Sequence, residues 1–180
     1  MATGLLAGMR WGESAALEWE DIDWRREEIT VRRTVSGDGT IQPPKGGKTR
    51  TIKASPALLK ALRSHKDSRE LEGVVKLKAS AEKRAASPLV FVSATGTQVS
   101  YTRFLKDFWK PMLKKAGLRY RRYHSLRHTF ATWLLSDGAP IQYVQAQLGH
   151  ATIAQTMDTY AHVQPDRHEH HAAALDRYIR

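Results

Sequence analysis

The last sixty residues of this 180-residue chain carry side chains whose types and order suit phosphoryl transfer. His124 and Arg127 lie three residues apart, His150 follows a glycine, and Tyr160 stands ten residues after His150. A guanidinium neutralises phosphate oxygens with donors held in a fixed fork, and a phenol can serve as a nucleophile. This order predicts that Tyr160 attacks a phosphodiester held by Arg127 and the two histidines.

A tyrosine nucleophile needs help from its surroundings. An unperturbed phenol has a pKa of about 10, so a nearby base and cationic field must supply roughly 4 kcal/mol at neutral pH. A few preorganised groups are adequate, because one oxyanion donor is worth roughly 3 to 4 kcal/mol. Ile153, Met157 and Tyr160 also form a helical stripe, so the pattern leaves open that Tyr160 is a core aromatic residue.

The other side chains have simpler interpretations when taken singly. Arg127 alone could be a solvated surface arginine, and His150 alone a structural histidine at a helix junction. His124 and His128 are four residues apart, as in a helical zinc site, but Ser125 stands where such a site has a glutamate as base. We therefore expect no metal ion at this pair.

The charge balance favours a polyanionic partner. The chain has 29 Lys and Arg against 18 Asp and Glu, a formal net charge of +11, which favours nucleic acid. No apolar run approaches the roughly 20 residues of a membrane span, and no secretory signal is evident, so we expect a soluble, intracellular protein. With no Cys, disulfides and thiolate zinc sites are excluded.

The elements that must position these side chains form a single domain, mainly α with a small peripheral antiparallel β-sheet (α+β). We expect a helix through Trp19, then a turn at 21–23 and a peripheral three-stranded sheet that includes 28–34 and 50–53, with a glycine-hinged basic tip at 43–48. Ser55 and Pro56 predict the start of a helix that fades near Gly73, residues 76–86 a solvated connection or exposed helical extension, and residues 89–92 a short buried strand.

The second half of the chain has a helical pattern. Ser100 is expected to cap a helix that ends at Gly117, with an apolar stripe that includes Phe108. Further helices are predicted at 125–137, 141–148, about 152–160 and 166–179.

Five segments, in order along the chain, carry a recognisable pattern. They are Gly8-Met9-Arg10-Trp11-Gly12-Glu13, residues 44–52, residues 124–132, Leu148-Gly149-His150 and Asp158-Thr159-Tyr160. Together they resemble the tyrosine recombinase family of phage-integrase type, which is related to the type IB topoisomerases. The resemblance covers nearly the whole chain and implies the family's catalytic-domain fold.

The resemblance also implies roles for the matching residues. Arg10 and Arg127 would be the catalytic arginines, His124 would assist proton transfer, and His150 would complete the site. Tyr160 would form a 3′-phosphotyrosyl link that a 5′-hydroxyl from another strand reverses. Because the adduct stores the bond energy, no ATP, metal or other cofactor is required.

The leaving oxygen needs a proton donor, which the family takes from a lysine in a β-turn. Lys45 matches that position, with Lys48 as a close rival. Ser14 departs from the pattern, because the family often has an apolar residue there.

The implied partners are double-stranded DNA and other recombinase protomers, tetrameric on paired sites, although the isolated domain could be a monomer. Residues 1–180 would be one catalytic domain without its N-terminal core-binding domain, a truncation, with a tail or exchange helix at 165–180. The resemblance implies integration or excision of a phage or other mobile element, in the cytoplasm of a bacterial or phage-infected cell and associated with the nucleoid.

Basic residues outside the site predict further DNA contacts. The candidates are Lys48, Arg50, Arg103, Lys106, Arg121 and Arg122. Two other functions stay open: a non-catalytic DNA-binding module of the same fold, and nicking and closing of the topoisomerase kind without strand exchange.

Overall fold

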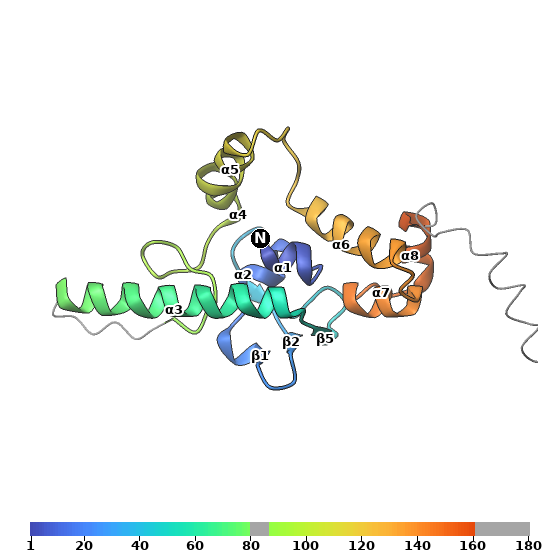
Figure 1. Ribbon diagram of the computed structural model, residues 1–180, viewed down its shortest axis with the longest axis horizontal. Coiled ribbons are helices and arrows are strands. Elements are labelled where there is room, and N and C mark those ends of the chain that lie inside the picture. Colours follow the sequence, from blue (N-terminus) through green and yellow to red (C-terminus); the bar gives the residue numbers. More distant parts are fainter. Residues whose placement is uncertain (80–86, 161–180) are drawn as a thin grey trace, which may run out of the picture.

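The computed structural model describes residues 1–79 and 87–160 (Figure 1). The helix predicted at 166–179 and the tail at 165–180 lie outside the described residues, as does most of the connection at 76–86. Within the described part, helices surround a small antiparallel sheet. The predicted class, mainly α with a small sheet, is confirmed.

The N-terminal segment forms two helices where one was predicted. Helix α1 spans Ala2–Leu6 and helix α2 spans Trp11–Ala15, followed by the short helix η1 at Trp19–Asp21. The break falls at Gly8, whose φ of 60° lies in the left-handed region that a glycine adopts without steric cost. Arg10, two residues later, is the N-cap of α2 in extended conformation. The break at Gly8 therefore sets the position of Arg10.

The sheet holds strands β1 (Ile22–Asp23), β2 (Glu28–Val31) and β5 (Arg50–Lys53) in the antiparallel order β1-β2-β5. The predicted three-stranded sheet is present, but the strand expected at 28–34 ends at Val31, and β1 replaces the turn expected at 21–23. Ile29 pairs with Ile52 across the two strands, so their side chains lie on one face of the sheet, and both are fully buried. Strands β3 (Thr34–Val35) and β4 (Ile41–Gln42) form a separate two-stranded sheet.

Helix α3 (Pro56–Ala79) runs across the molecule (Figure 1). It begins as predicted: the Ser55 hydroxyl accepts a hydrogen bond from the backbone N–H of Leu58 at 3.3 Å. The helix continues past Gly73, where it was expected to fade. Its residues Leu58, Leu59 and Leu62 bury against the inward face of the sheet.

The strand predicted at 89–92 is wrong. Leu89 makes one isolated bridge to Glu18, and the N–H of Val90 donates to the carbonyl of Leu17. Val90 is buried as expected, but its backbone partner is the irregular segment after α2, so no ladder can extend.

The segment after Ser100 is helical but changes its winding. Helix α4 (Tyr101–Arg103) leads into the π-helical η2 (Phe104–Trp109) and then α5 (Lys110–Lys115), with the Ser100 hydroxyl capping as predicted. A π-helical turn adds a residue per turn and rotates the rest of the helix about its axis. Trp109 is therefore buried, while Phe108, predicted to lie in the apolar stripe, is 51% exposed.

The last three described helices lie close to their predicted positions: α6 (His124–Ser136), α7 (Ile141–Leu148) and α8 (Ile153–Tyr160). They share a core in which Tyr160 packs with Leu135, Val144 and Leu148. Figure 1 shows these helices together at one end of the molecule, with α6 beside α1 and α7 beside β5. Among the described helices, none is long and apolar enough to cross a membrane.

Helix α2 approaches strand β3 too closely for a side chain at position 12. A Cβ built on Gly12 would overlap the carbonyl oxygen of Val35 and lie 2.6 Å from the Thr34 hydroxyl. We predict that Gly12→Ala lowers the free energy of unfolding by about 1–3 kcal/mol, as overpacking does elsewhere, in urea denaturation followed by tryptophan fluorescence. Gly37→Ala is the control, because a Cβ there meets nothing within 4 Å. Equal stability of the two variants would contradict the prediction.

Candidate active site

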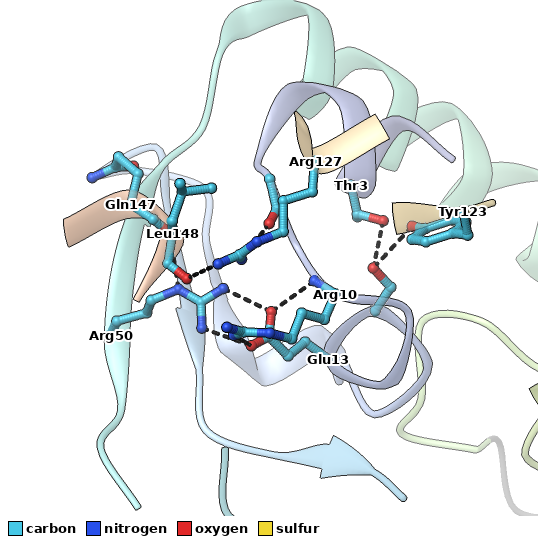
Figure 2. A network of polar contacts seen from close by, with 10 residues as sticks. Thr3, Arg10, Glu13, Arg50, Tyr123, Arg127, Gln147 and Leu148 are labelled. Atoms are coloured by element: carbon cyan, nitrogen blue, oxygen red, sulfur yellow. Dashed lines mark hydrogen bonds and ion pairs between the residues drawn. The ribbon is translucent and has the colours of Figure 1, made fainter. Parts of the chain in front are cut away.

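Arg127 joins the separate segments of the site. Its side chain is buried, and its guanidinium donates from Nη1 to the carbonyl of Gly8 at 2.7 Å and from Nη2 to the carbonyl of Leu148 at 2.5 Å (Figure 2). Gly8 stands two residues before Arg10, and Leu148 two residues before His150. One guanidinium of α6 therefore holds both the loop of the first arginine and the loop of the second histidine.

A buried carboxylate holds two further arginines. Glu13 is 1% exposed, and its carboxylate accepts from both terminal nitrogens of Arg50, at 2.8 and 2.7 Å. It also accepts from the backbone N–H of Arg10 at 2.8 Å and from the Arg10 guanidinium at 2.9 Å. Arg50 in turn donates from Nε to the carbonyl of Gln147 at 2.9 Å. Figure 2 shows Arg10, Arg50 and Arg127 gathered around Glu13.

The pKa values of Arg127 and Glu13 reflect the close approach of the three arginines. Burial lowers the pKa of Arg127 to about 9; the charge of Arg10 acts in the same direction, and the charge of Glu13 opposes it. Burial alone would raise the pKa of Glu13, but the hydrogen bonds and charge of Arg50, followed by those of Arg10, hold it at about 2. One carboxylate thus faces three guanidinium groups, and an anion bound there would relieve their mutual repulsion.

Both predicted histidines lie within this cationic field. Burial lowers the pKa of His150 to about 4, with further lowering by Arg127, Arg10 and Arg50, so the ring is neutral at pH 7. Its Nδ1 lies 2.9 Å from the hydroxyl of buried Thr156. His124, the first residue of α6, also has a lowered pKa, through burial first and then the charges of His128, Arg127 and Arg10.

Tyr160, the predicted nucleophile, is a core residue whose hydroxyl contacts a histidine of α6. Its ring is buried among α6, α7 and α8, as the helical stripe allowed. Its hydroxyl, however, lies 2.8 Å from Nδ1 of His128, a surface histidine on α6. Burial raises the pKa of Tyr160 above its ordinary value, and the charge of Arg127 acts against that.

Lys45 lies at an exposed β-turn between β4 and β5. The N–H of Gly47 donates to the carbonyl of Pro44 at 2.8 Å and closes the turn. Lys48 is exposed on the same connection between β4 and β5. Among the described residues, no hydrogen bond or ion pair joins Lys45 or Lys48 to Glu13, the carboxylate around which the arginines gather.

The predicted DNA-contacting residues divide into two groups. Arg50 has its side chain turned inward, only 10% exposed, and bonded to Glu13 and Gln147. The other five are exposed: Lys48, Arg103, Lys106, Arg121 and Arg122. The sequence holds a signal for the inward position of Arg50. Alternate residues of a strand share a face, and Arg50 is two residues from buried Ile52.

Two other functional candidates were also missed. Glu13 was seen only as part of a motif, although a glutamate three residues after an N-cap is a capping-box signal, and here it caps Arg10. His128 was considered only as a metal ligand. Among residues 1–79 and 87–160, no group of three His, Cys, Asp or Glu side chains is placed to hold a metal ion.

Ser14, the departure from the apolar pattern, is buried with its hydroxyl 2.9 Å from the Thr3 hydroxyl and 3.3 Å from that of Tyr123. These bonds link α1, α2 and the N-cap of α6 (Figure 2). A polar side chain is accommodated because Thr3 and Tyr123 satisfy it.

Comparison with known proteins identifies relatives of this chain. Residues 3–167 match the model of the Phage integrase family. The chain is 32% identical over 173 residues to a tyrosine recombinase XerC-like protein of Caldanaerobacter subterraneus subsp. tengcongensis, covering 88% of this chain and 43% of that protein. It is 31% identical over 181 residues to prophage integrase IntR of Escherichia coli K12, covering 94% of this chain and 44% of that protein.

Solved structures show the same fold. The crystal structure of XerA recombinase matches with a TM-score of 0.67 and 29% identity, over 98% of this chain and 56% of that one. The Tn1549 transposon integrase in complex with circular intermediate DNA matches with a TM-score of 0.74 and 21% identity, over 97% and 58%. The chain spans less than half the length of the XerC-like protein and of IntR.

The buried Glu13 carboxylate predicts how stability depends on pH. Its pKa falls from 4.5 to about 2 on folding, so its contribution is fully present above about pH 4.5 and is lost as the pH falls through 2. The loss amounts to about 3 kcal/mol. We predict that Glu13→Gln destabilises the protein at pH 6 and that the difference from the parent shrinks by pH 3, in urea denaturation at both values. Glu27→Gln, on an exposed side chain, is the control. A difference that stays constant with pH would contradict this origin.

Proposed function

The chain belongs to the phage integrase family, and from that premise we propose that it is the DNA-cleaving and rejoining domain of a site-specific recombinase. The observation that carries the proposal is the pair of hydrogen bonds from Arg127 to the carbonyls of Gly8 and Leu148. Through them, residues from three distant segments meet around one buried positive charge. A cluster of this kind needs an anion, and a DNA phosphate is the anion that the family's chemistry supplies.

The proposed reaction begins with a phosphodiester between the guanidinium groups of Arg10 and Arg127. A guanidinium has five N–H donors, so the two carbonyls bound to Arg127 do not exhaust it. Charge that builds on the non-bridging oxygens would be stabilised by donors that are already in place, which is the largest catalytic term in many enzymes. His150, neutral at pH 7, can donate a hydrogen bond from Nε2 while its Nδ1 faces Thr156.

Tyr160 is the proposed nucleophile. Its oxygen would form a bond to phosphorus while the bond to the 5′ oxygen breaks, which leaves a 3′-phosphotyrosyl link. The 5′ oxygen would take a proton from a general acid, for which Lys45 on the β-turn is our candidate. A 5′-hydroxyl from another strand would then reverse the step and release the phenol, with no external energy source.

The partners and setting are part of the same proposal. The Tn1549 integrase structure is a complex with DNA, and we extend duplex DNA as a partner to this chain. The exposed basic residues Lys48, Arg103, Lys106, Arg121 and Arg122 would contact the backbone, which positions a duplex without specifying sequence. Assembly of several protomers on paired sites, and action at the nucleoid of a bacterial or phage-infected cell, belong to this proposal as well.

A covalent-capture experiment tests the nucleophile. Because no target site is named by the sequence, nicked duplexes of randomised sequence would be incubated with the protein, and DNA that stays attached on a denaturing gel would be selected. We predict that the parent forms such an adduct and that Tyr160→Phe forms none. Phenylalanine keeps the ring packing and removes one hydrogen bond, a change of about 1 kcal/mol, so the variant should remain folded. An adduct of equal yield from Tyr160→Phe would remove Tyr160 from this role.

A sulfur leaving group tests the general acid. A 5′-bridging thiolate departs without a proton, so the loss caused by removing the acid should vanish on that substrate. We predict that Lys45→Ala slows adduct formation on the oxygen substrate by about 10²- to 10⁴-fold, the usual range for general acid catalysis. On the sulfur substrate, the variant should react at the parent rate. Lys48→Ala, three residues further along the same loop, is the matched control. If Lys48→Ala is the variant rescued by sulfur, the acid is Lys48.

A further inference from the structure

The contact between His128 and Tyr160 has no part in the proposed reaction of the arginines, His150 and Lys45. Nδ1 of His128 lies 2.8 Å from the phenol oxygen, with the two ring centres 5.8 Å apart. His128 directly follows Arg127 on α6, so the residue that holds the phosphate site together and the residue that touches the phenol are neighbours in the chain. No other hydrogen bond to the phenol oxygen is found among the described residues.

The direction of this hydrogen bond is set by the chemistry of the two groups. Burial, followed by the charge of Arg127, lowers the pKa of His128 below its ordinary value, so the ring is neutral at pH 7. A phenol is a stronger acid than a neutral imidazole N–H, so the hydroxyl of Tyr160 donates and Nδ1 of His128 accepts. The ring proton of His128 is then on Nε2.

The surroundings of the pair favour a neutral base. The ring of His124 meets the ring of His128 edge to face, with centres 4.8 Å apart, and His124 also has a lowered pKa. The charge of Arg127 on α6 acts on both rings, and those of Arg10, the N-cap of α2, and Glu13 act on His124. On α8, Asp158 stands two residues before Tyr160. Burial is the main cause of the lowered pKa of both rings and the charge of Arg127 adds to it, so both are neutral at pH 7.

We propose that His128 is the general base that accepts the proton of Tyr160 during DNA cleavage, a role that rests on the proposed function of Tyr160 as nucleophile. As the phenol oxygen forms its bond to phosphorus, its proton moves to Nδ1 of His128, which becomes an imidazolium. The bond from phosphorus to the 5′ oxygen breaks, and that oxygen takes its proton from the general acid. In the reverse step the departing phenol oxygen regains its proton from His128.

The geometry favours His128 over the other two histidines. His150 has its Nδ1 at the Thr156 hydroxyl, and among the described contacts neither His150 nor His124 reaches the phenol oxygen. His128 is also exposed, so its ring can exchange protons with water between the forward and the reverse step. A base is needed because burial makes this phenol less acidic than a free one, which is already ionised to only about one part in a thousand at pH 7.

A substitution that keeps the hydrogen bond but loses the basicity separates a base from an anchor. In His128→Asn, the amide oxygen can stand close to the position of Nδ1 and accept from the phenol, yet it cannot take a proton. We expect adduct formation by His128→Asn to be slower by about 10²- to 10⁴-fold at pH 7, on the duplex selected by covalent capture with the parent. Tyr143→Phe, on an exposed tyrosine of α7, is the control and should react at the parent rate.

The pH profile provides the second readout. From pH 6 to 9, the parent rate should fall only toward the acid end, where His128 becomes protonated below the ordinary histidine pKa of about 6.5. In His128→Asn, the rate should rise about tenfold per pH unit up to the pKa of the phenol, because only the ionised phenol can then attack. In His128→Gly, added imidazole should restore adduct formation, since the site is open to solvent.

The outcomes distinguish this inference from the proposed function. If Tyr160→Phe still forms the adduct, the nucleophile assignment fails and this inference fails with it. If the adduct needs Tyr160 but His128→Asn reacts within about threefold of the parent from pH 6 to 9, only the role of His128 is overturned. Circular dichroism of each variant, matched to the parent, excludes unfolding as the cause of a lost rate.

Discussion

The two hydrogen bonds from the Arg127 guanidinium to backbone carbonyls are the interaction on which the rest of the site depends. A buried guanidinium is costly unless its donors are satisfied, and Arg127 meets that condition with the carbonyls of Gly8 and Leu148. Each carbonyl lies two residues before a further site residue, Arg10 or His150, so satisfying the one charge of Arg127 fixes two loops at once. Glu13 completes the arrangement, because its carboxylate offsets the repulsion among the guanidinium groups around it.

Much of this fold could be predicted from local patterns, and the failures have separate physical causes. The helices α6, α7 and α8 follow apolar spacing and a helix-ending glycine, so their positions were predicted to within a few residues. The break between α1 and α2 depends on the backbone of Gly8, which the apolar spacing does not reveal. The π-helical turn in η2 is likewise not revealed by the apolar spacing in the sequence. It buries Trp109 in the core in place of Phe108.

The site itself was predictable as a set of residue types but not as a set of contacts. The order of Arg127, His150 and Tyr160 indicates phosphoryl transfer, whereas the partners of Arg50 depend on how β5 packs against α7. The sequence marked Arg50 as one basic residue among many, because charge alone does not distinguish a surface contact from a buried ion pair. Removing one member of such a buried pair typically costs about 3–5 kcal/mol, so Arg50 contributes to the architecture of the site whatever it contributes to binding.

Tyr160 shows why the two interpretations of a helical stripe need not exclude each other. Its ring contributes to the core of α6, α7 and α8, and burying a large apolar side chain of this kind is worth about 1.5–3 kcal/mol. The hydroxyl extends beyond this core to the imidazole of His128, which is exposed on α6. As the proposed nucleophile, Tyr160 would be rigid before substrate arrives, because the core fixes the ring and the hydrogen bond fixes the proton. Preorganisation of this kind means that the core-forming role of the ring supports its chemical role.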